Sequence, residues 1–327
     1  MFQKNVLLKN YSHYKIGGPA RYFFEAKNID VLIDAVEGWR RFYSDGRIRI
    51  VEDQRPAVRY SDTIFVVGDA TNILFDDNGF EGLIFKPNIK TFETASDILR
   101  VGAGVPINEI LDCSIAKGLS GMEWAGGLPG TLGGAIYGNA GCFGGEIKDN
   151  IREVLSLDIS SSKPKIVRRA NRECDFSYRS SIFKKNKGKE IILEATLIFK
   201  KGDKKVIRSA IEEKINYRKE RQPLEYPNIG SIFKNVDLKK VPKKLHKEFA
   251  HVIKTDPFPV IPTAHLIHEV GLKGISFGGA MISLKHPNFI VNALNASAED
   301  VKKLIALIKN KVKEKFLIDL EEEIIQL

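Results

Sequence analysis

EWAGGLPGTLGGAIYGNAGCFGG, residues 123–145, is the stretch of the sequence that decides the fold. Eleven of the twenty-eight residues from Gly118 to Gly145 are glycine, but large apolar side chains such as Trp124 and Leu128 interrupt them. A flexible linker is rich in glycine and serine and poor in apolar side chains. We therefore expect this stretch to be packed, irregular backbone rather than a linker.

Such a backbone suits contact with an anion. Glycine is needed where φ is positive or where a ligand lies against the main chain, and successive N–H groups form anion-binding nests. Pyrophosphate is the natural candidate, although the familiar nucleotide loops GxxxxGK[ST] and GxGxxG are absent. Tight structural turns alone are the alternative explanation. A second loop, GDATN at 68–72, offers N–H groups and a hydroxyl, but a plain turn has the same composition.

The composition suits a soluble globular protein. The 327 residues, 43% hydrophobic and 28% charged, suffice for two or three domains with a sizeable core. The three cysteines are widely spaced, without a CxxC pair or a zinc-ligand cluster, which favours free thiols in a reducing cytoplasm and no metal site. No segment approaches the ~18 apolar residues of a membrane helix, so we expect a cytoplasmic protein without membrane contact.

The excess of positive charge has two interpretations. The net charge is +10 and the pI is near 9.3, but the lysines are scattered through several short runs. Only a gathered patch supports binding to nucleic acid through its phosphates. Solvated lysines on helix faces and loops are favoured, and the same charge suits a small polyanionic ligand such as a nucleotide.

Hydrophobic periodicity predicts strands and helices throughout the chain. They alternate in the first third, and a change of pattern near residue 201 marks the expected domain boundary. A last helix is expected after Ser297, with Asp300 as the partner in a capping box. Its expected buried stripe is Val301, Leu304, Ile305, Ile308, Val312 and Phe316. The other expected helices cover 29–43, 106–119 and 206–222, and the expected strands cover 21–26, 63–68, 82–86, 98–104, 153–159, 165–170, 190–200 and 317–327.

Seven sequence blocks stand in order along nearly the whole chain: NYSHYKIGGPA at 10–20, residues 68–85, residues 118–149, DFSYRSSIFKK at 175–185, QPLEYPNIGSIFKN at 222–235, GLKGISFGGAMISLKHPNFIVNA at 271–293 and LEEEI at 320–324. Together they resemble the blocks of the UDP-N-acetylenolpyruvoylglucosamine reductase (MurB) family. The most specific block is 118–149, which resembles the family's second flavin loop, and the block at 68–85 resembles the first. The short spacing from DFSYRSS to QPLEYPNIGS resembles the family branch that lacks a tyrosine-bearing insertion.

The resemblance implies an α+β flavoprotein. Residues 1–200 would form an FAD-binding domain of the PCMH or vanillyl-alcohol-oxidase type, built from two α+β subdomains. Residues 201–327 would form the family's α+β domain for the UDP-sugar substrate. The implied reaction is ping-pong: NADPH reduces FAD, which then reduces the enolpyruvyl group of UDP-N-acetylglucosamine enolpyruvate to give UDP-N-acetylmuramate for peptidoglycan precursor synthesis. We expect a monomer that binds this small molecule and no nucleic acid.

Three residues match the family's catalytic positions. Arg179, in FSYRSS, matches the arginine that stabilises the enolate, and a guanidinium fork fits a carboxylate bidentately. Ser231, in NIGSIF, matches the serine that donates the proton. Glu323 matches the C-terminal glutamate assigned to acid or electrostatic help, although Glu321 shares its face of the expected strand and periodicity does not distinguish the two.

Further residues match binding positions of the family. Arg221 lies near the diphosphate-binding basic residue and Asn235 near the substrate-contacting asparagine. His286 is placed near the substrate carboxylate, with a structural role as the alternative. The residues that the resemblance assigns to FAD are Gly68, Asp69, Ala70, Thr71, Asn72, Pro129, Gly130, Gly133, Gly134, Asn139, Ala140 and Gly141.

The chain departs from the family pattern at several positions. Ala70 stands where the first flavin loop usually has glycine, so it is strained if its φ is positive. Thr71 replaces a serine and keeps the hydroxyl, whereas Gly138 replaces a methionine. Residues 236–258 are an extra segment, for which we expect a surface excursion.

Two other functions are open from the sequence. Another FAD oxidoreductase of the same flavin-binding fold would keep the glycine loops but would lack Arg179, Ser231 and Glu323 in one pocket. A basic nucleic-acid-binding protein without a cofactor would stay colourless even after FAD is supplied.

Overall fold

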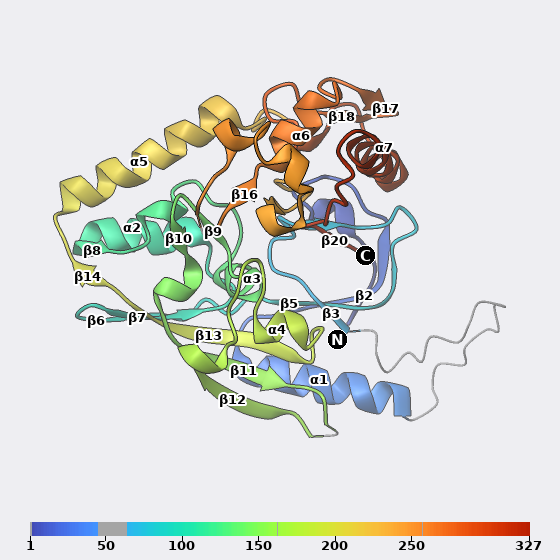
Figure 1. Cartoon of the computed structure of the whole chain (residues 1–327). Coiled ribbons are helices and arrows are strands. Elements are labelled where there is room, and N and C mark those ends of the chain that lie inside the picture. Colours follow the sequence, from blue (N-terminus) through green and yellow to red (C-terminus); the bar gives the residue numbers. More distant parts are fainter. Residues whose placement is uncertain (1, 45–63, 162, 257) are drawn as a thin grey trace. The chain divides into compact units, whose positions relative to one another are not determined.

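A computed structural model describes residues 2–44, 64–161, 163–256 and 258–327 (Figure 1). Helices and strands are mixed along the chain, as the α+β expectation requires. The residues gather into two compact units, and each unit is assembled from separate stretches of the sequence. The assignment of residues 1–200 to FAD binding and of residues 201–327 to UDP-sugar binding stays a prediction. Unit 1 is drawn from Met1–Val6, Ala20–Gly68 and Glu81–Lys214, and unit 2 from Leu7–Pro19, Asp69–Phe80 and Ile215–Leu327.

A four-stranded sheet of unit 1, in the order β1-β2-β5-β3, packs against helix α1 (Ile29–Ser44). Leu32, Val36 and Trp39 recur every three or four residues along α1 and are buried in one cluster with the sheet. The Asn28 side chain accepts a hydrogen bond from the Val31 N–H at 2.9 Å and caps the helix. The strands are β1 (Gln3–Leu7), β2 (Pro19–Ala26), β3 (Ile64–Val66) and β5 (Phe80–Pro87).

A five-stranded antiparallel sheet of unit 1 has the order β12-β11-β13-β7-β6. Its central strand β13 is buried along almost its whole length, including the carboxylates of Glu190 and Glu194. Arg169 pairs with Glu190 at 2.6 Å and Arg100 pairs with Glu194 at 2.6 Å, which offsets the cost of burying these charges. The strands are β6 (Phe92–Ala95), β7 (Ile98–Gly102), β11 (Ile151–Asp158), β12 (Lys165–Ala170) and β13 (Glu190–Ile198).

Shorter elements complete unit 1. The long helix α5 follows them, starts in unit 1 and ends before Pro223, as the sequence predicts. The helices are α2 (Ile107–Lys117), α3 (Leu132–Gly138), α4 (Ile182–Lys185) and α5 (Lys204–Arg221). The paired short strands are β8 (Leu119–Ser120) with β14 (Lys200–Lys201), and β9 (Gly141–Cys142) with β10 (Gly145–Glu146).

Unit 2 is built around helix α7 (Ala298–Phe316), drawn in dark red in Figure 1. The Ser297 hydroxyl accepts from the Asp300 N–H at 3.1 Å, and the Asp300 carboxylate accepts from the Ser297 N–H at 3.0 Å. This reciprocal pair is the predicted capping box. All six residues of the predicted stripe are buried, so the prediction for this helix is confirmed.

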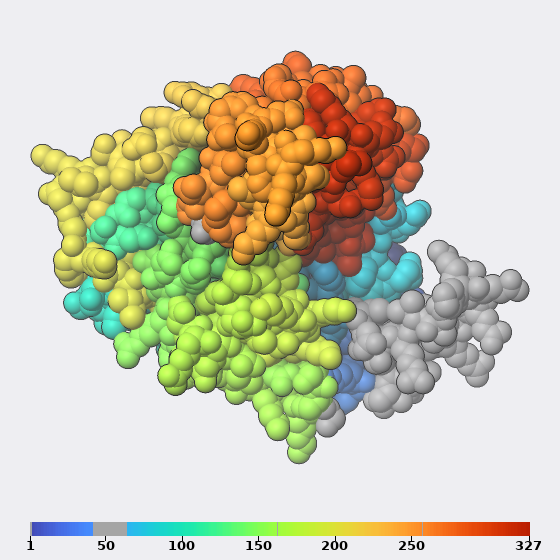
Figure 2. Space-filling view, in the orientation of Figure 1, coloured from blue at the N-terminus to red at the C-terminus, as the bar shows by residue number. Residues whose placement is uncertain are grey.

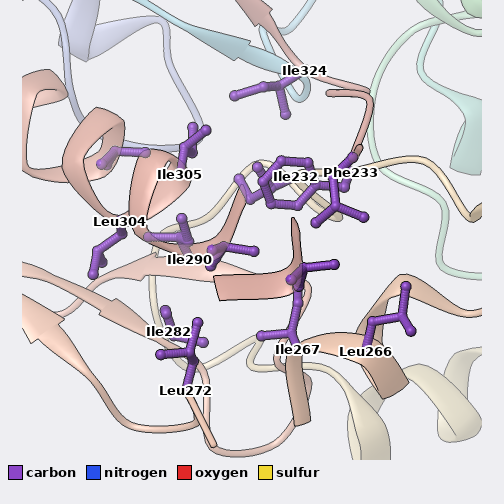
Figure 3. Close-up of a cluster of buried hydrophobic side chains, with 14 of the residues drawn as sticks. Ile232, Phe233, Leu266, Ile267, Leu272, Ile282, Ile290, Leu304, Ile305 and Ile324 are labelled. Carbon is purple, nitrogen blue, oxygen red and sulfur yellow. The ribbon is translucent and has the colours of Figure 1, made fainter. Parts of the chain in front are cut away.

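The stripe of α7 enters one apolar cluster of unit 2 (Figure 3). Ile232 and Phe233 lie near Ile324 in this cluster, and Leu304 and Ile305 enter it from α7. The remaining elements are helix α6 (Thr263–Glu269), the sheet of β17 (Ser276–Phe277), β18 (Ala280–Ile282) and β19 (Ile290–Asn292), the pair β15 (Val236–Asp237) and β16 (Val260–Ile261), and the parallel pair β4 (Ile73–Leu74) and β20 (Ile325–Gln326).

The expectation of a surface excursion for residues 236–258 is wrong. Val241 and Phe249 are 4% and 1% exposed and belong to the cluster around α7. Phe249 also lies edge to face against Phe316, with ring centroids 5.3 Å apart. Three short 3-10 turns bring Val241, Leu245 and Phe249 toward the core, while the lysines of the segment stay exposed. The bar of Figure 2 gives residues near 250 in orange.

Two of the predicted strands are shorter in the structure than in the prediction. Of the predicted strand 317–327, only β20 forms, with one isolated bridge at Glu322. Thr63, the first residue of the predicted strand 63–68, lies outside the described residues. Cys113, Cys142 and Cys174 are free thiols, as predicted. Within the described ranges, no helix is both long and apolar enough to cross a membrane.

Candidate active site

The glycine-rich stretch at 118–149 is packed backbone of unit 1, as predicted, but it is not irregular, because α3, β8, β9 and β10 lie within it. The Leu132 N–H donates to the Val105 carbonyl at 2.9 Å, and the Gly133 N–H donates to the Ala103 carbonyl at 2.9 Å. These bonds fix the stretch against the loop that follows β7. A slack linker would lack such bonds.

Two backbone donors just before α3 have no backbone acceptor. Among the described residues, the N–H groups of Gly130 and Thr131 donate to no backbone oxygen, although Thr131 is only 4% exposed. Burying an N–H without an acceptor is costly, which applies to buried Thr131, and the adjacent N–H of half-buried Gly130 adds a second donor, so the pair fits a bound oxyanion such as pyrophosphate. Thr131 is absent from the residues predicted from the sequence. Its signal is that of a helix cap, and its Oγ1 accepts from the Gly134 N–H at 3.4 Å.

Gly68→Ala is expected to destabilise unit 1. A Cβ atom at Gly68 would lie 2.6 Å from Oγ1 of Thr131, so the loop would have to shift. Overpacking of this kind lowers the free energy of unfolding by about 1–3 kcal/mol. Urea unfolding followed by tryptophan fluorescence measures it, because both tryptophans, Trp39 and Trp124, belong to unit 1. In the control Gly38→Ala, the new Cβ meets nothing within 4 Å. Equal stability of Gly68→Ala and the parent would contradict the close approach.

Arg179 lies in a tight turn of unit 1 that is bonded to the glycine-rich stretch. Ser177 and Ser180 exchange two backbone hydrogen bonds of 3.0 Å, and Arg179 has a φ of +55° within that turn. The guanidinium Nη1 donates to the Gly141 carbonyl at 2.9 Å, and the Asn139 side chain donates to the Ser177 carbonyl at 3.0 Å. The structure therefore brings Arg179 together with predicted FAD residues at 139–141.

Ser231 and Glu323 are brought together in unit 2. The Glu323 N–H donates to the Ile232 carbonyl at 2.8 Å, and an antiparallel bridge joins Phe233 to Glu322. The Ser231 side chain is half-buried, and its hydroxyl makes no hydrogen bond with another described residue. Its proton is therefore not engaged by any other residue that the structure describes.

The carboxylates of Glu321 and Glu322 form ion pairs with lysines. Glu321 pairs with Lys234, and Glu322 pairs with Lys309. Periodicity does not distinguish Glu321 from Glu323. The choice of Glu323 over Glu321 therefore rests on the family resemblance, and the catalytic role of Glu323 stays a prediction.

Of the predicted flavin loop at 68–72, Gly68 belongs to unit 1 and residues 69–72 belong to unit 2. Ala70 is buried and has a φ of +50°, so the strain expected of a non-glycine residue there is present. The N–H groups of Ala70 and Thr71 donate to no backbone oxygen of the described residues, which fits an anion as ligand. The Asn72 side chain, which the resemblance assigns to FAD, donates to the Glu323 carbonyl at 3.0 Å in this structure.

Ala70→Gly is expected to stabilise unit 2 slightly or leave it unchanged. The left-handed conformation costs a non-glycine residue about 1–2 kcal/mol, whereas the greater freedom of glycine in the unfolded chain costs about 0.5–1 kcal/mol. Circular dichroism during urea unfolding measures the difference. Ala306→Gly, on the exposed face of α7 in the same unit, is the control and should lose about 1 kcal/mol. A similar loss at both positions would count against strain at Ala70.

Two of the predicted substrate-binding residues have structural contacts in unit 2. Arg221 is the last residue of α5, and its guanidinium lies 4.8 Å from the ring centroid of Tyr217. The Asn235 side-chain oxygen accepts from the Thr263 N–H at 3.3 Å, so Asn235 anchors the start of α6. Their contact with substrate stays a prediction.

His286 is a neutral imidazole at neutral pH. Its ring packs edge to face against Phe289, with centroids 4.8 Å apart. Burial lowers the pKa of His286 to about 4, with smaller contributions from the charges of Lys254 and Lys273. Its Nδ1 is buried and makes no hydrogen bond with a described residue. Any contact with a substrate carboxylate would therefore be a neutral hydrogen bond rather than an ion pair.

Two family models match the sequence in succession. The model described as an FAD binding domain matches residues 50–162. The model described as the C-terminal domain of UDP-N-acetylenolpyruvoylglucosamine reductase matches residues 222–327.

Relatives and a solved structure are similar to the chain over almost its full length. The UDP-N-acetylenolpyruvoylglucosamine reductase of Clostridium novyi (strain NT) is 32% identical over 324 residues, which cover 98% of this chain and 91% of the relative. That of Anoxybacillus flavithermus is 34% identical over 328 residues, covering 98% and 93%. The crystal structure of UDP-N-acetylenolpyruvylglucosamine reductase from Thermus caldophilus is 27% identical with a TM-score of 0.73, covering 100% of this chain and 99% of that one. The predicted fold class is confirmed.

Proposed function

The chain belongs to the UDP-N-acetylenolpyruvoylglucosamine reductase family, and from this premise we propose that it reduces UDP-N-acetylglucosamine enolpyruvate to UDP-N-acetylmuramate with electrons from NADPH. It is a flavin-dependent oxidoreductase of peptidoglycan precursor synthesis. The observation that carries the proposal is the ordered pair of family models, the FAD-binding one followed by the reductase C-terminal domain. A cofactor-free nucleic-acid-binding protein does not account for this pair.

The backbone offers donors that fit the phosphates of FAD. In unit 1 the N–H groups of Gly130 and Thr131 donate to no backbone oxygen of a described residue, and in unit 2 the same holds for Ala70 and Thr71. Such groups bind phosphate oxygens, so we assign these four residues to FAD. When bound, FAD supplies the hydride that it has received from NADPH.

Arg179 is assigned to the charge that develops on the substrate. When the terminal methylene carbon of the enolpyruvyl group accepts a hydride, an electron pair moves onto the carboxylate and forms an enolate. The Arg179 guanidinium is fixed by its bond to the Gly141 carbonyl, so it needs little reorganisation to stabilise that charge. A planar fork also matches the two carboxylate oxygens.

Ser231 is assigned to the proton transfer. Its hydroxyl proton goes to the carbon that bears the ether oxygen, the electron pair of the enolate forms the new C–H bond, and the serine oxygen regains a proton from solvent. A serine hydroxyl is a weak acid in water, so its position must supply much of the effect. Glu323, bonded to the neighbouring Ile232, assists in a protonated or water-linked form, because a bare carboxylate would repel the enolate.

The test mixes purified protein, NADPH and UDP-N-acetylglucosamine enolpyruvate and follows the absorbance of the nicotinamide. We expect NADPH oxidation that requires the enolpyruvate. The control substrate, UDP-N-acetylglucosamine, lacks the double bond and should give none. A protein that binds FAD and is reduced by NADPH, but ignores the enolpyruvate, would be a different FAD oxidoreductase.

We also propose that the protein acts as a monomer in the cytoplasm without binding nucleic acid. The three free thiols suit a reducing compartment. Light scattering after size-exclusion chromatography tests the oligomeric state, and the mass of a dimer would contradict this part of the proposal.

A further inference from the structure

Asn72 connects the loop at 69–72 to the segment that carries Glu323. Its side-chain Nδ2 donates to the Glu323 carbonyl at 3.0 Å, across 251 positions of sequence. Its own backbone carbonyl accepts from the Ile325 N–H at 3.0 Å. One asparagine therefore holds the chain on both sides of Ile324.

The segment of Ser231 holds Glu323 from the other edge. The Glu323 N–H donates to the Ile232 carbonyl at 2.8 Å, so both backbone polar groups of Glu323 have partners. Beyond Ile325, β20 continues parallel to β4 with Ile325 opposite Ile73. With its main chain bonded on both edges, Glu323 keeps only its side-chain rotamers as freedom.

We propose that Asn72 is a positioning residue for Glu323, and that its carboxamide serves the acid of the reaction rather than the flavin. The inference rests on the proposed function, because that function assigns Glu323 to the proton transfer. Asparagine suits the task because its carboxamide donates to a carbonyl oxygen, whereas an ionised aspartate of the same shape only accepts. A misplacement of about 1 Å costs up to ~10²-fold in rate.

This assignment separates the two half-reactions. A side chain that served FAD would, on removal, weaken flavin binding and disturb the reduction by NADPH. A side chain that places Glu323 would leave these unchanged and slow only the reoxidation of the flavin by substrate, where the proton is transferred. The half-reactions therefore distinguish the two roles.

The test compares Asn72→Ala and Asn72→Asp with the parent in the FAD-loaded enzyme by stopped-flow absorbance. Both variants lose the side-chain N–H that donates to the Glu323 carbonyl. Asn72→Asp keeps the shape of the side chain, so this variant tests the inference if Asn72→Ala does not fold. We expect reoxidation to slow by ~10-fold or more, with flavin content and reduction by NADPH unchanged. Amide hydrogen exchange of residues 321–327 in the FAD-free protein should become faster. Asn78→Ala, an exposed asparagine of the same segment, should behave like the parent.

A double-mutant cycle with Glu323→Gln shows whether the effect passes through Glu323. If it does, adding Asn72→Ala to Glu323→Gln slows reoxidation little further, and the two changes are far from additive. The inference is overturned if the two effects multiply, if reoxidation keeps the parent rate, or if the loss lies in flavin binding or in reduction by NADPH. A parent enzyme that ignores the enolpyruvate refutes the proposed function and this inference with it. An active parent with multiplicative effects refutes the inference alone.

Discussion

Ser231→Ala is expected to block most of the second half of the reaction while sparing the first. NADPH should still reduce the flavin of the variant, but substrate should reoxidise it ~10²-fold more slowly or worse. The hydroxyl makes no hydrogen bond with another described residue, so its removal leaves no buried partner unsatisfied. Stopped-flow absorbance of the flavin measures each half-reaction by itself.

The matched control is Ser276→Ala. Ser276 is an exposed serine of β17 in the same unit. In the Ser276→Ala variant, flavin reduction by NADPH and flavin reoxidation by substrate should both keep the parent rates. If Ser231→Ala is reoxidised as fast as the parent, Ser231 takes no part in the proton transfer.

Arg179→Gln is expected to slow reoxidation by ~10²–10³-fold, because it removes the charge that stabilises the enolate. Glutamine and arginine are both non-glycine residues, so the strain at a φ of +55° is unchanged. Arg179→Lys keeps the charge but loses the planar fork, and its rate should lie between those of Arg179→Gln and the parent. Single-turnover reoxidation with excess substrate measures all three.

Flavin content must be recorded beside these rates, because Nη1 of Arg179 also donates to the Gly141 carbonyl. Arg172→Gln, an exposed arginine of the same unit, is the control and should keep the parent rate. A parent-like rate per bound flavin, with FAD weakly held, would reassign Arg179 to cofactor binding.

The sequence predicted those features of the fold that depend on residues close together in the chain. Helix α7 was predictable because its cap, its capping partner and its stripe recur at helical spacing. The glycine-rich stretch was predictable as packed backbone because Trp124 and Leu128 interrupt its glycines. In both cases the information lies within one segment of the chain.

Long-range pairings were not predictable from such patterns. The stretch 317–327 looks like one strand, but residues 321–323 bond to the segment of Ser231 while β20 bonds to β4, so no continuous ladder forms. Residues 236–258 were expected to form a surface excursion because they are an extra segment relative to the family pattern. Val241 and Phe249 enter the core from separate turns without a helical period, so nothing in the sequence indicates their burial. The candidate site residues came from a resemblance, and the bond from Asn72 to Glu323 has no signal in the sequence.

The discontinuous assembly of unit 2 has a consequence for its synthesis. Leu7–Pro19 and Asp69–Phe80 leave the ribosome long before β20, the partner of β4. Until then Tyr14 and Leu74, which are buried in the finished unit, have no core to enter. Contacts so distant in sequence slow folding. The nascent chain therefore keeps these apolar segments exposed until β20 has been made, and chaperones protect such chains from aggregation in the meantime.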